Sequence, residues 1–208
     1  MPNLPERIAA VRNSVFGLFR FRRLAADQAN IGIVGTVWCI GDRRFITAQH
    51  VLNNGQARQP GDSFELLRAP GNGAQLDRIP VQGFLLENLS KDIAVLEVAS
   101  KSLNHLSPIQ PIPISFDAIE DGLEIFSYGY PEPAVQVGPA DAQGRQQGIQ
   151  TVMMSRANTG IVSAQYPING EQKLEVTIDW FNGESGGPII RTDSGMAIGF
   201  MQATRKTA

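Results

Sequence analysis

Cysteine, histidine and long apolar runs are scarce in this sequence. Only one of its 208 residues is cysteine, so no disulfide can form within the chain, which suits a reducing compartment. No run approaches the roughly 20 apolar residues of a membrane-spanning helix. Arg7 and Arg12 interrupt the only stretch that resembles the apolar core of a signal peptide. We therefore expect a cytoplasmic protein that does not bind membranes.

The chain also has little net charge. The chain has 18 Lys and Arg residues against 20 Asp and Glu, a formal net charge of −2. This balance gives no electrostatic reason to expect nucleic acid as a partner. The densest basic run contains Arg20, Arg22 and Arg23 and flanks the first predicted strand. We interpret it as a solvated strand edge that discourages pairing with other chains.

Short runs rich in Val, Ile and Phe, separated by clusters of Gly, Pro and Asn, indicate an all-β protein. Strands are predicted over residues 15–21, 32–40, 45–47, 64–67, 81–87, 93–98, 124–128, 149–154, 160–165, 174–179, 188–191 and 196–201. Regularly spaced short strands are typical of sandwiches and barrels. A short helix is predicted over residues 5–13, and the polar, glycine-rich residues 138–147 predict a mobile loop.

The segment Gly183–Pro188, which reads GESGGP, has the features of a nucleophile loop. A serine hydroxyl attacks a carbonyl only when a base takes its proton and donors stabilise the oxyanion. Gly183 can adopt a positive φ, which would direct its N–H and that of Ser185 into one small hole. We therefore identify Ser185 as the candidate nucleophile and the amides of Gly183 and Ser185 as the candidate oxyanion hole. A glycine-rich turn without chemistry is the alternative.

A serine nucleophile needs a base, and the chain has two histidines. His50 stands where an apolar strand runs into a short helical turn, and element ends present reactive groups from a rigid scaffold. His105 lies in a polar, proline-flanked loop, as expected of a solvated surface histidine. His50 is therefore the predicted base.

Asp92 is the predicted third member of the site. It leads directly into an apolar run that we interpret as a buried strand, and a carboxylate there could accept a hydrogen bond from the far imidazole nitrogen. An aspartate that merely ends a turn is equally compatible with this position taken alone. The histidine and serine motifs favour the catalytic interpretation.

The order His50, Asp92, Ser185, with the motifs TAQH, DIAVL and GESGGP around them, resembles the chymotrypsin-like (trypsin-like) serine peptidases over residues 14–204. The resemblance implies two antiparallel six-stranded β-barrels with the active site in the cleft between them. Val51 stands where the secreted animal enzymes carry a disulfide cysteine, so the chain is most similar to the bacterial HtrA-like branch, without an evident PDZ domain.

The resemblance also implies a division of the chain. Residues 14–99 would form the N-terminal barrel, residues 100–122 the connection, and residues 123–208 the C-terminal barrel. Only residues 202–208 follow the last predicted strand, where the family has a further strand and a helix. We therefore expect that the last strand of the second barrel is missing, either by truncation from a longer protein or because the barrel closes unusually.

Two departures from the secreted enzymes bear on activation. Glu184 occupies the place of the aspartate that pairs with a newly cut N-terminus, and the sequence does not identify its partner here. Ile33-Val34-Gly35 mimics the exposed N-terminal sequence but lies one strand before His50. We therefore expect no activation by N-terminal insertion.

Substrate is expected to lie as an extended strand beside Gln202, Ala203 and Thr204. By resemblance, Asp179 falls where trypsin places the acid of its specificity pocket, which would select Arg or Lys. The alternative is an aspartate that ends the strand 174–178, with small or medium apolar residues preferred in the substrate, as in HtrA-like enzymes.

These observations predict a serine endopeptidase that acts on protein or peptide substrates through an acyl-enzyme. This chemistry requires no metal or other cofactor. A second class stays open, namely a peptidase-fold module without turnover that binds or regulates within a larger assembly. An enzyme switched on by an activating partner, or by further domains beyond residue 208, is the third alternative.

Overall fold

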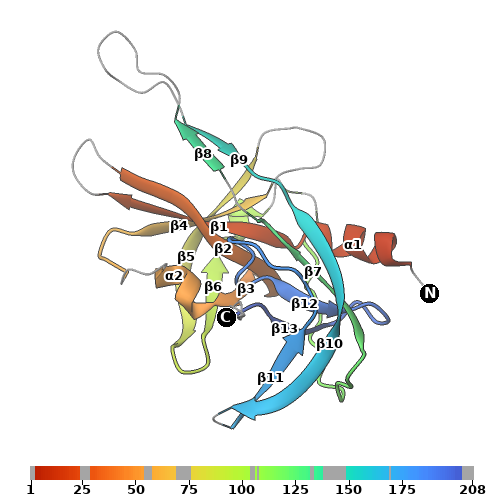
Figure 1. The fold of residues 1–208 in the computed structure, drawn as a ribbon. Helices are drawn as coiled ribbons and strands as arrows, with labels where there is room; N and C mark the ends of the chain where they lie inside the picture. Colours follow the sequence, from red (N-terminus) through yellow and green to blue (C-terminus); the bar gives the residue numbers. More distant parts are fainter. Residues whose placement is uncertain are drawn as a thin grey trace, which may run out of the picture.

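The computed structural model describes residues 3–23, 29–53, 58–68, 76–103, 106, 108–131, 134–137, 149–168 and 170–202. The strands form a closed six-stranded barrel, a five-stranded sheet and a two-stranded ribbon (Figure 1). The expected all-β architecture is therefore confirmed. None of the helices within the described ranges has the length and apolar character needed to cross a membrane.

The first barrel closes in the order β1-β2-β3-β6-β5-β4, with all neighbours antiparallel. Its strands are β1 (Val15–Arg23), β2 (Ala29–Gly41), β3 (Arg44–Ala48), β4 (Ser63–Arg68), β5 (Asp77–Asn88) and β6 (Ile93–Val98). Alternate side chains point inward, as in β6, where Ala94, Leu96 and Val98 are all buried. The rings of Phe16 and Phe45 meet edge to face in this core, with centroids 5.5 Å apart.

Two helices lie next to these strands in the sequence, α1 before β1 and α2 after β3, and α1 contacts β7 of the second unit. Helix α1 (Leu4–Arg12) begins with a capping box, in which the Asn3 side chain accepts from the Glu6 amide and the Glu6 carboxylate accepts from the Asn3 amide. Arg7 of this helix donates to the carbonyl of Asp193 at the far sheet. Helix α2 (Gln49–Asn53) follows β3 directly and is only five residues long.

The second unit is a half-barrel. Its five-stranded sheet has the order β11-β10-β7-β12-β13, and the ribbon pairs β8 with β9. These elements are β7 (Glu124–Gly129), β8 (Ala134–Val137), β9 (Ile149–Val152), β10 (Arg156–Ile168), β11 (Glu171–Val176), β12 (Pro188–Arg191) and β13 (Ala197–Phe200). The edge strands β11 and β13 leave the sixth position of a closed barrel unfilled among the described residues, as expected from the sequence.

A shared apolar cluster joins the barrel to the sheet. It contains Val15, Phe19, Trp38 and Ile46 from the barrel and Phe126, Tyr128, Tyr130 and Ile190 from the sheet side. The chain crosses between the two units through the short helix η1 (Ser100–Ser102) and then an extended segment. That segment bonds to both units, because Ile112 donates to the carbonyl of Cys39 in β2 and the Ala197 amide of β13 donates to the carbonyl of Pro113.

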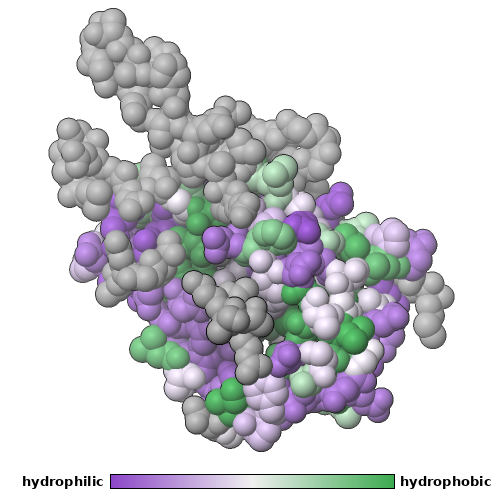
Figure 2. Space-filling view, viewed as in Figure 1, coloured by the Kyte–Doolittle hydropathy of each residue, from purple (hydrophilic) through white to green (hydrophobic). Residues whose placement is uncertain are grey.

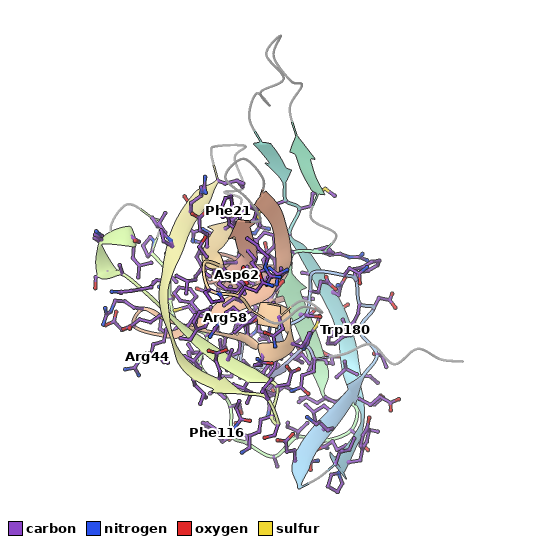
Figure 3. All side chains as sticks on the ribbon, turned by 90° about the vertical axis from the view of Figure 1, so that its left-hand side faces the viewer. Phe21, Arg44, Arg58, Asp62, Phe116 and Trp180 are labelled. Atoms are coloured by element: carbon purple, nitrogen blue, oxygen red, sulfur yellow. The ribbon has the colours of Figure 1, made fainter. Side chains whose placement is uncertain are left out.

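The interpretation of the basic run as a solvated strand edge is wrong. β1 pairs with β2 on one side and β4 on the other, so it is not an edge strand. Arg20 and Arg22 are only 5% and 3% exposed. Arg22 donates twice to Asp62, at 2.7 and 2.6 Å, and Arg20 donates to the carbonyl of Asn53 at 3.0 Å. Asp62 lies among the barrel strands in Figure 3.

Candidate active site

The strand β3 and the short helix α2 place His50 at the edge of the barrel. The side chain of His50 is 45% exposed, whereas its neighbours Gln49 and Val51 are buried. The Gln49 amide donates to the carbonyl of Asp92 at 3.0 Å. The start of α2 is therefore tied to the turn that carries Asp92.

Asp92 ends the turn between β5 and β6 and has φ +53°, a left-handed conformation that aspartate tolerates better than most residues. Its carboxylate accepts two hydrogen bonds from His50. Oδ1 accepts from the backbone amide and Oδ2 lies 2.7 Å from ring Nδ1. Because the carboxylate only accepts, Nδ1 must carry a proton, which leaves Nε2 of the neutral ring free to accept one.

The loop of Ser185 lies against β2 of the first barrel. The amide of Thr36 donates to the carbonyl of Ser185 at 2.8 Å. An added Cβ at Gly35 would collide with Val51 and with that carbonyl, so a glycine is needed for this close approach. Among the described residues, the hydroxyl of Ser185 makes no hydrogen bond with His50.

The backbone around Ser185 presents two unused donors. Gly183 has φ +96°, and neither its amide nor that of Ser185 has an acceptor within the described part of the chain. The adjacent carbonyls are engaged, because Gly183 accepts from Thr36 Oγ1 at 2.8 Å and Glu184 accepts from the Gly187 amide at 2.9 Å. Two neighbouring free amides are the arrangement that an oxyanion hole requires.

Glu184 lies between these two residues and is fully buried. Its Oε1 accepts from Asn158 Nδ2 at 3.1 Å and its Oε2 accepts from the Phe181 amide at 3.0 Å. Burial raises the pKa of Glu184, while the Phe181 amide, the charge of Arg156 and Asn158 act in the opposite direction. Sequence reasoning left the partner of Glu184 open, because Asn158 is distant in the sequence and carries no motif.

Ile33, Val34 and Gly35 lie inside β2, paired with β1 through part of their length. They do not form a free N-terminus. Cys39 of the same strand is buried, and burial raises the pKa of its thiol.

The structure describes two of the four residues predicted to contact substrate, Asp179 and Gln202. Gln202 lies between the two units, because its Nε2 donates to the carbonyl of Lys91 at 3.1 Å and its Oε1 accepts from Lys173 at 2.9 Å. Asp179 is exposed and lies three residues after β11 ends at Val176, so it does not end that strand. Ala203, Thr204, His105 and the loop 138–147 lie outside the described residues.

A half-open groove of about 1020 Å³ runs between the edge strands β11 and β13. Both Asp179 and Gln202 line it, together with apolar side chains that include Leu174, Ile178, Trp180, Ile189 and Ile198. Trp180 is labelled on the sheet side in Figure 3. Figure 2 shows that hydrophobic residues on one face of the molecule form several separate patches rather than one continuous surface.

Comparison with known proteins identifies the family. Residues 35–200 match the trypsin-like peptidase domain. The chain belongs to this family. The match covers His50, Asp92 and Ser185 and most of both units, so it includes the whole candidate site.

Solved structures confirm the chymotrypsin-like double-barrel fold. The chain is similar to the Rv3671c protease from M. tuberculosis in its active form, with a TM-score of 0.59 and 20% identity over 96% of this chain and 74% of that one. An inactive serine-to-alanine mutant of the same protease gives a TM-score of 0.58 and 20% identity, over 98% and 80% of the two chains. No curated protein matches the sequence.

Proposed function

We propose that this trypsin-like peptidase domain is a serine endopeptidase that cleaves protein substrates through an acyl-enzyme. The observation that carries the proposal is the pair of hydrogen bonds from His50 to Asp92. They fix the imidazole with Nδ1 protonated, so Nε2 can act as a base toward the serine of a family motif. The free amides of Gly183 and Ser185 support the same chemistry.

In the proposed mechanism, His50 Nε2 takes the hydroxyl proton of Ser185 as Oγ bonds to the scissile carbonyl carbon. Asp92 stabilises the resulting imidazolium, and the Gly183 and Ser185 amides donate to the oxyanion. The C–N bond then breaks as His50 returns the proton to the leaving amine. Water repeats the sequence on the acyl-enzyme and releases the acid product and the free serine.

The absent Ser185–His50 hydrogen bond is compatible with this mechanism. Catalytic hydrogen bonds are often long or poorly aligned in free enzymes and tighten in the Michaelis complex. We expect Ser185 Oγ to reach Nε2 when a substrate carbonyl occupies the hole.

The missing hydrogen bond between Ser185 and His50 also favours a second candidate, a protein that depends on a partner. Such a protein is either an enzyme that the partner activates or a peptidase-fold binding module without turnover. A site with an unformed nucleophile–base contact, beside an open position between β11 and β13, is what a partner-dependent protein would have before assembly. The two candidates differ in what the isolated protein does with an active-site reagent.

Labelling with a fluorophosphonate separates them. The uncut protein beginning at Met1 should be labelled at Ser185 and should cleave members of a peptide library. Ser185→Ala should abolish labelling and lower kcat by about 10⁴–10⁶ while the fold is retained. Equal turnover by Ser185→Ala would exclude the proposed mechanism, and an unlabelled but folded wild-type protein would favour the partner-dependent alternative. Ser127→Ala, which changes a buried serine on β7, is the matched control.

A further inference from the structure

The side chain and backbone of Glu184 together close a turn around Gly183. The Glu184 amide donates to the carbonyl of Phe181 at 3.2 Å, and the Phe181 amide donates to the Glu184 carboxylate at 3.0 Å. This reciprocal pair fixes both ends of the segment 181–184. The carboxylate therefore acts on the backbone that supplies one of the two candidate oxyanion donors.

The orientation of the second donor depends on the next peptide plane. In a trans peptide the C=O and N–H point in opposite directions. The Glu184 carbonyl is held by the Gly187 amide at 2.9 Å, so the Ser185 N–H, in the same peptide, points the other way. A shift of Glu184 would thus turn the Ser185 amide as well as the Gly183 segment.

Asn158 anchors this turn to the sheet. It lies in β10 and is 8% exposed, and its Nδ2 donates to Glu184 Oε1 at 3.1 Å and to the carbonyl of Asp179 at 3.3 Å. One amide group therefore links the beginning of the loop, at Asp179, to its centre, at Glu184. Residues 156–161 of β10 pair with β7 and residues 162–168 pair with β11, so the part of β10 that carries Asn158 is held in the sheet by β7.

The loop also has a charged contact on the same strand face. Arg156 lies two residues before Asn158, on the same side of β10, and its guanidinium stacks over the Phe181 ring at 4.3 Å. Arg156 attracts the Glu184 carboxylate but is itself exposed. Direct hydrogen bonding to the buried carboxylate therefore comes from two neutral donors, the Phe181 amide and the Asn158 side chain.

We propose that Asn158 is a positioning residue for the oxyanion hole, which it holds in a binding-competent form through Glu184 without proteolytic cleavage. This inference rests on the proposed peptidase function. Asn158 does not contact the reacting atoms. It acts by keeping the carboxylate of Glu184, and with it the peptide planes on either side, in one orientation.

The test compares kcat, KM and the inhibition constant of a peptide aldehyde, whose adduct with serine carries an oxyanion. Asn158→Leu keeps the side-chain size but removes the donor. We expect kcat to fall about 10- to 100-fold. Losing one oxyanion donor altogether lowers kcat by a factor of roughly 10²–10³, and a donor that is only misplaced should lower it less. KM should stay within about twofold, and the aldehyde should bind more weakly in the same proportion as kcat falls. Ser127→Ala, directly opposite Asn158 on β7, should match the wild type, because its hydroxyl has no hydrogen-bond partner among the described residues.

A second pair of variants covers the case in which Asn158→Leu does not fold. Asn158→Asp places a carboxylate against Glu184 and should impair kcat more than Asn158→Leu. Adding Glu184→Gln to Asn158→Asp removes the repulsion between the two carboxylates. The kcat of the double variant should be at least about tenfold higher than that of Asn158→Asp alone, which is a non-additive result.

Unchanged kcat and aldehyde affinity in folded Asn158 variants would overturn the inference, as would strictly additive losses in the double variant. An inactive and unlabelled wild-type protein would instead remove the proposed function on which the inference rests.

Discussion

Asp92 holds His50 at two points, accepting from its backbone amide and from its ring nitrogen Nδ1, each at 2.7 Å. The backbone contact fixes where α2 begins, and the ring contact fixes which nitrogen carries the proton. One carboxylate therefore determines both the position and the tautomer of the proposed base. The left-handed φ of Asp92 is consistent with a turn shaped to make both bonds.

Asp92→Asn should leave the position of His50 unchanged but alter which of its ring nitrogens carries the proton. The amide Oδ1 of the asparagine can still accept from the His50 backbone, but its NH₂ group would face Nδ1 and force the proton onto Nε2. We expect kcat to fall by about 10⁴ with little change in KM. The measurement is the rate of peptide hydrolysis. Asp193→Asn, which replaces a carboxylate on the remote turn between β12 and β13, is the control variant and should keep the wild-type rate. Full activity in Asp92→Asn would mean that this carboxylate does not orient the base.

Thr36→Val should destabilise the protein and impair turnover. The Thr36 hydroxyl is buried, donates to the Gly183 carbonyl at 2.8 Å and accepts from the Tyr130 amide at 3.2 Å. Valine has nearly the same shape and removes both of these hydrogen bonds, at a cost of roughly 1–3 kcal/mol. Urea denaturation and kcat should both report the loss. Thr47→Val removes a buried hydroxyl whose one hydrogen bond within the described ranges goes to the Thr36 carbonyl, and it should lower stability with a smaller effect on kcat.

Local patterns predicted the strands well where packing agrees with the sequence. β6 was predicted over residues 93–98, as observed, because these residues form a short and nearly continuous apolar run. β5 and β10 begin four residues before their predicted starts. Each added segment contains residues that are depleted in strands, Asp77 and Pro80 in one and Ala157 and Asn158 in the other, and pairing with β4 and β7 decides their conformation. β8 was missed because it is only four residues long and follows a proline-rich segment.

The site was predictable to the extent that its residues carry local motifs. Gly183 and Ser185 stand in one short motif, and His50 and Asp92 each adjoin a recognisable strand. Asn158 could not be found in this way, because its contact with Glu184 spans 26 residues.

The buried arginines show the same limitation. The charge of Arg22 indicated a solvated surface, but its partner Asp62 is 40 residues away. Only strand pairing brings the two together inside the barrel. Long-range polar contacts of this kind have no periodic signature in the sequence.

The Arg22–Asp62 pair should make stability depend on pH in the acid range. Hydrogen bonding to Arg22 lowers the pKa of Asp62 to about 2, against the effect of burial, whereas an unfolded chain has a value of about 3.9. The stabilisation is therefore complete above about pH 4 and is lost as pH falls toward 2. Asp62→Asn should be less stable than the wild type at neutral pH, and the difference should shrink over this window in urea titrations. Asp193→Asn, which breaks an exposed pair with Arg191, should have a smaller and salt-sensitive effect.

Substrate preference should follow the apolar side chains that line the groove, and the carboxylate of Asp179, which lines the same groove, should contribute little. The Asp179 side chain is exposed, so its carboxylate would select a cationic residue only weakly. We expect cleavage after small or medium apolar residues in a denatured protein, as identified by mass spectrometry, with the same profile in Asp179→Ser. Enrichment of Arg and Lys that disappears in Asp179→Ser would assign Asp179 to the specificity pocket instead.

Glu184→Gln should remove a pH-dependent cost of burying a carboxylate. Burial raises the pKa of Glu184 in the folded protein above the value of about 4.3 of an unfolded chain. Between these two values the folded state retains a proton that the unfolded state has released, so the free energy of unfolding falls as pH rises through the window and stays lower above it. Glutamine cannot ionise. Its oxygen keeps an acceptor for the Phe181 amide, while its NH₂ group faces Asn158 Nδ2, a cost that does not vary with pH. The variant should therefore gain stability relative to the wild type as pH rises from about 4. Urea denaturation between pH 4 and 8, with the exposed Glu120→Gln as control, measures this difference. A constant difference between wild type and Glu184→Gln across that range would show that the buried carboxylate does not titrate within it.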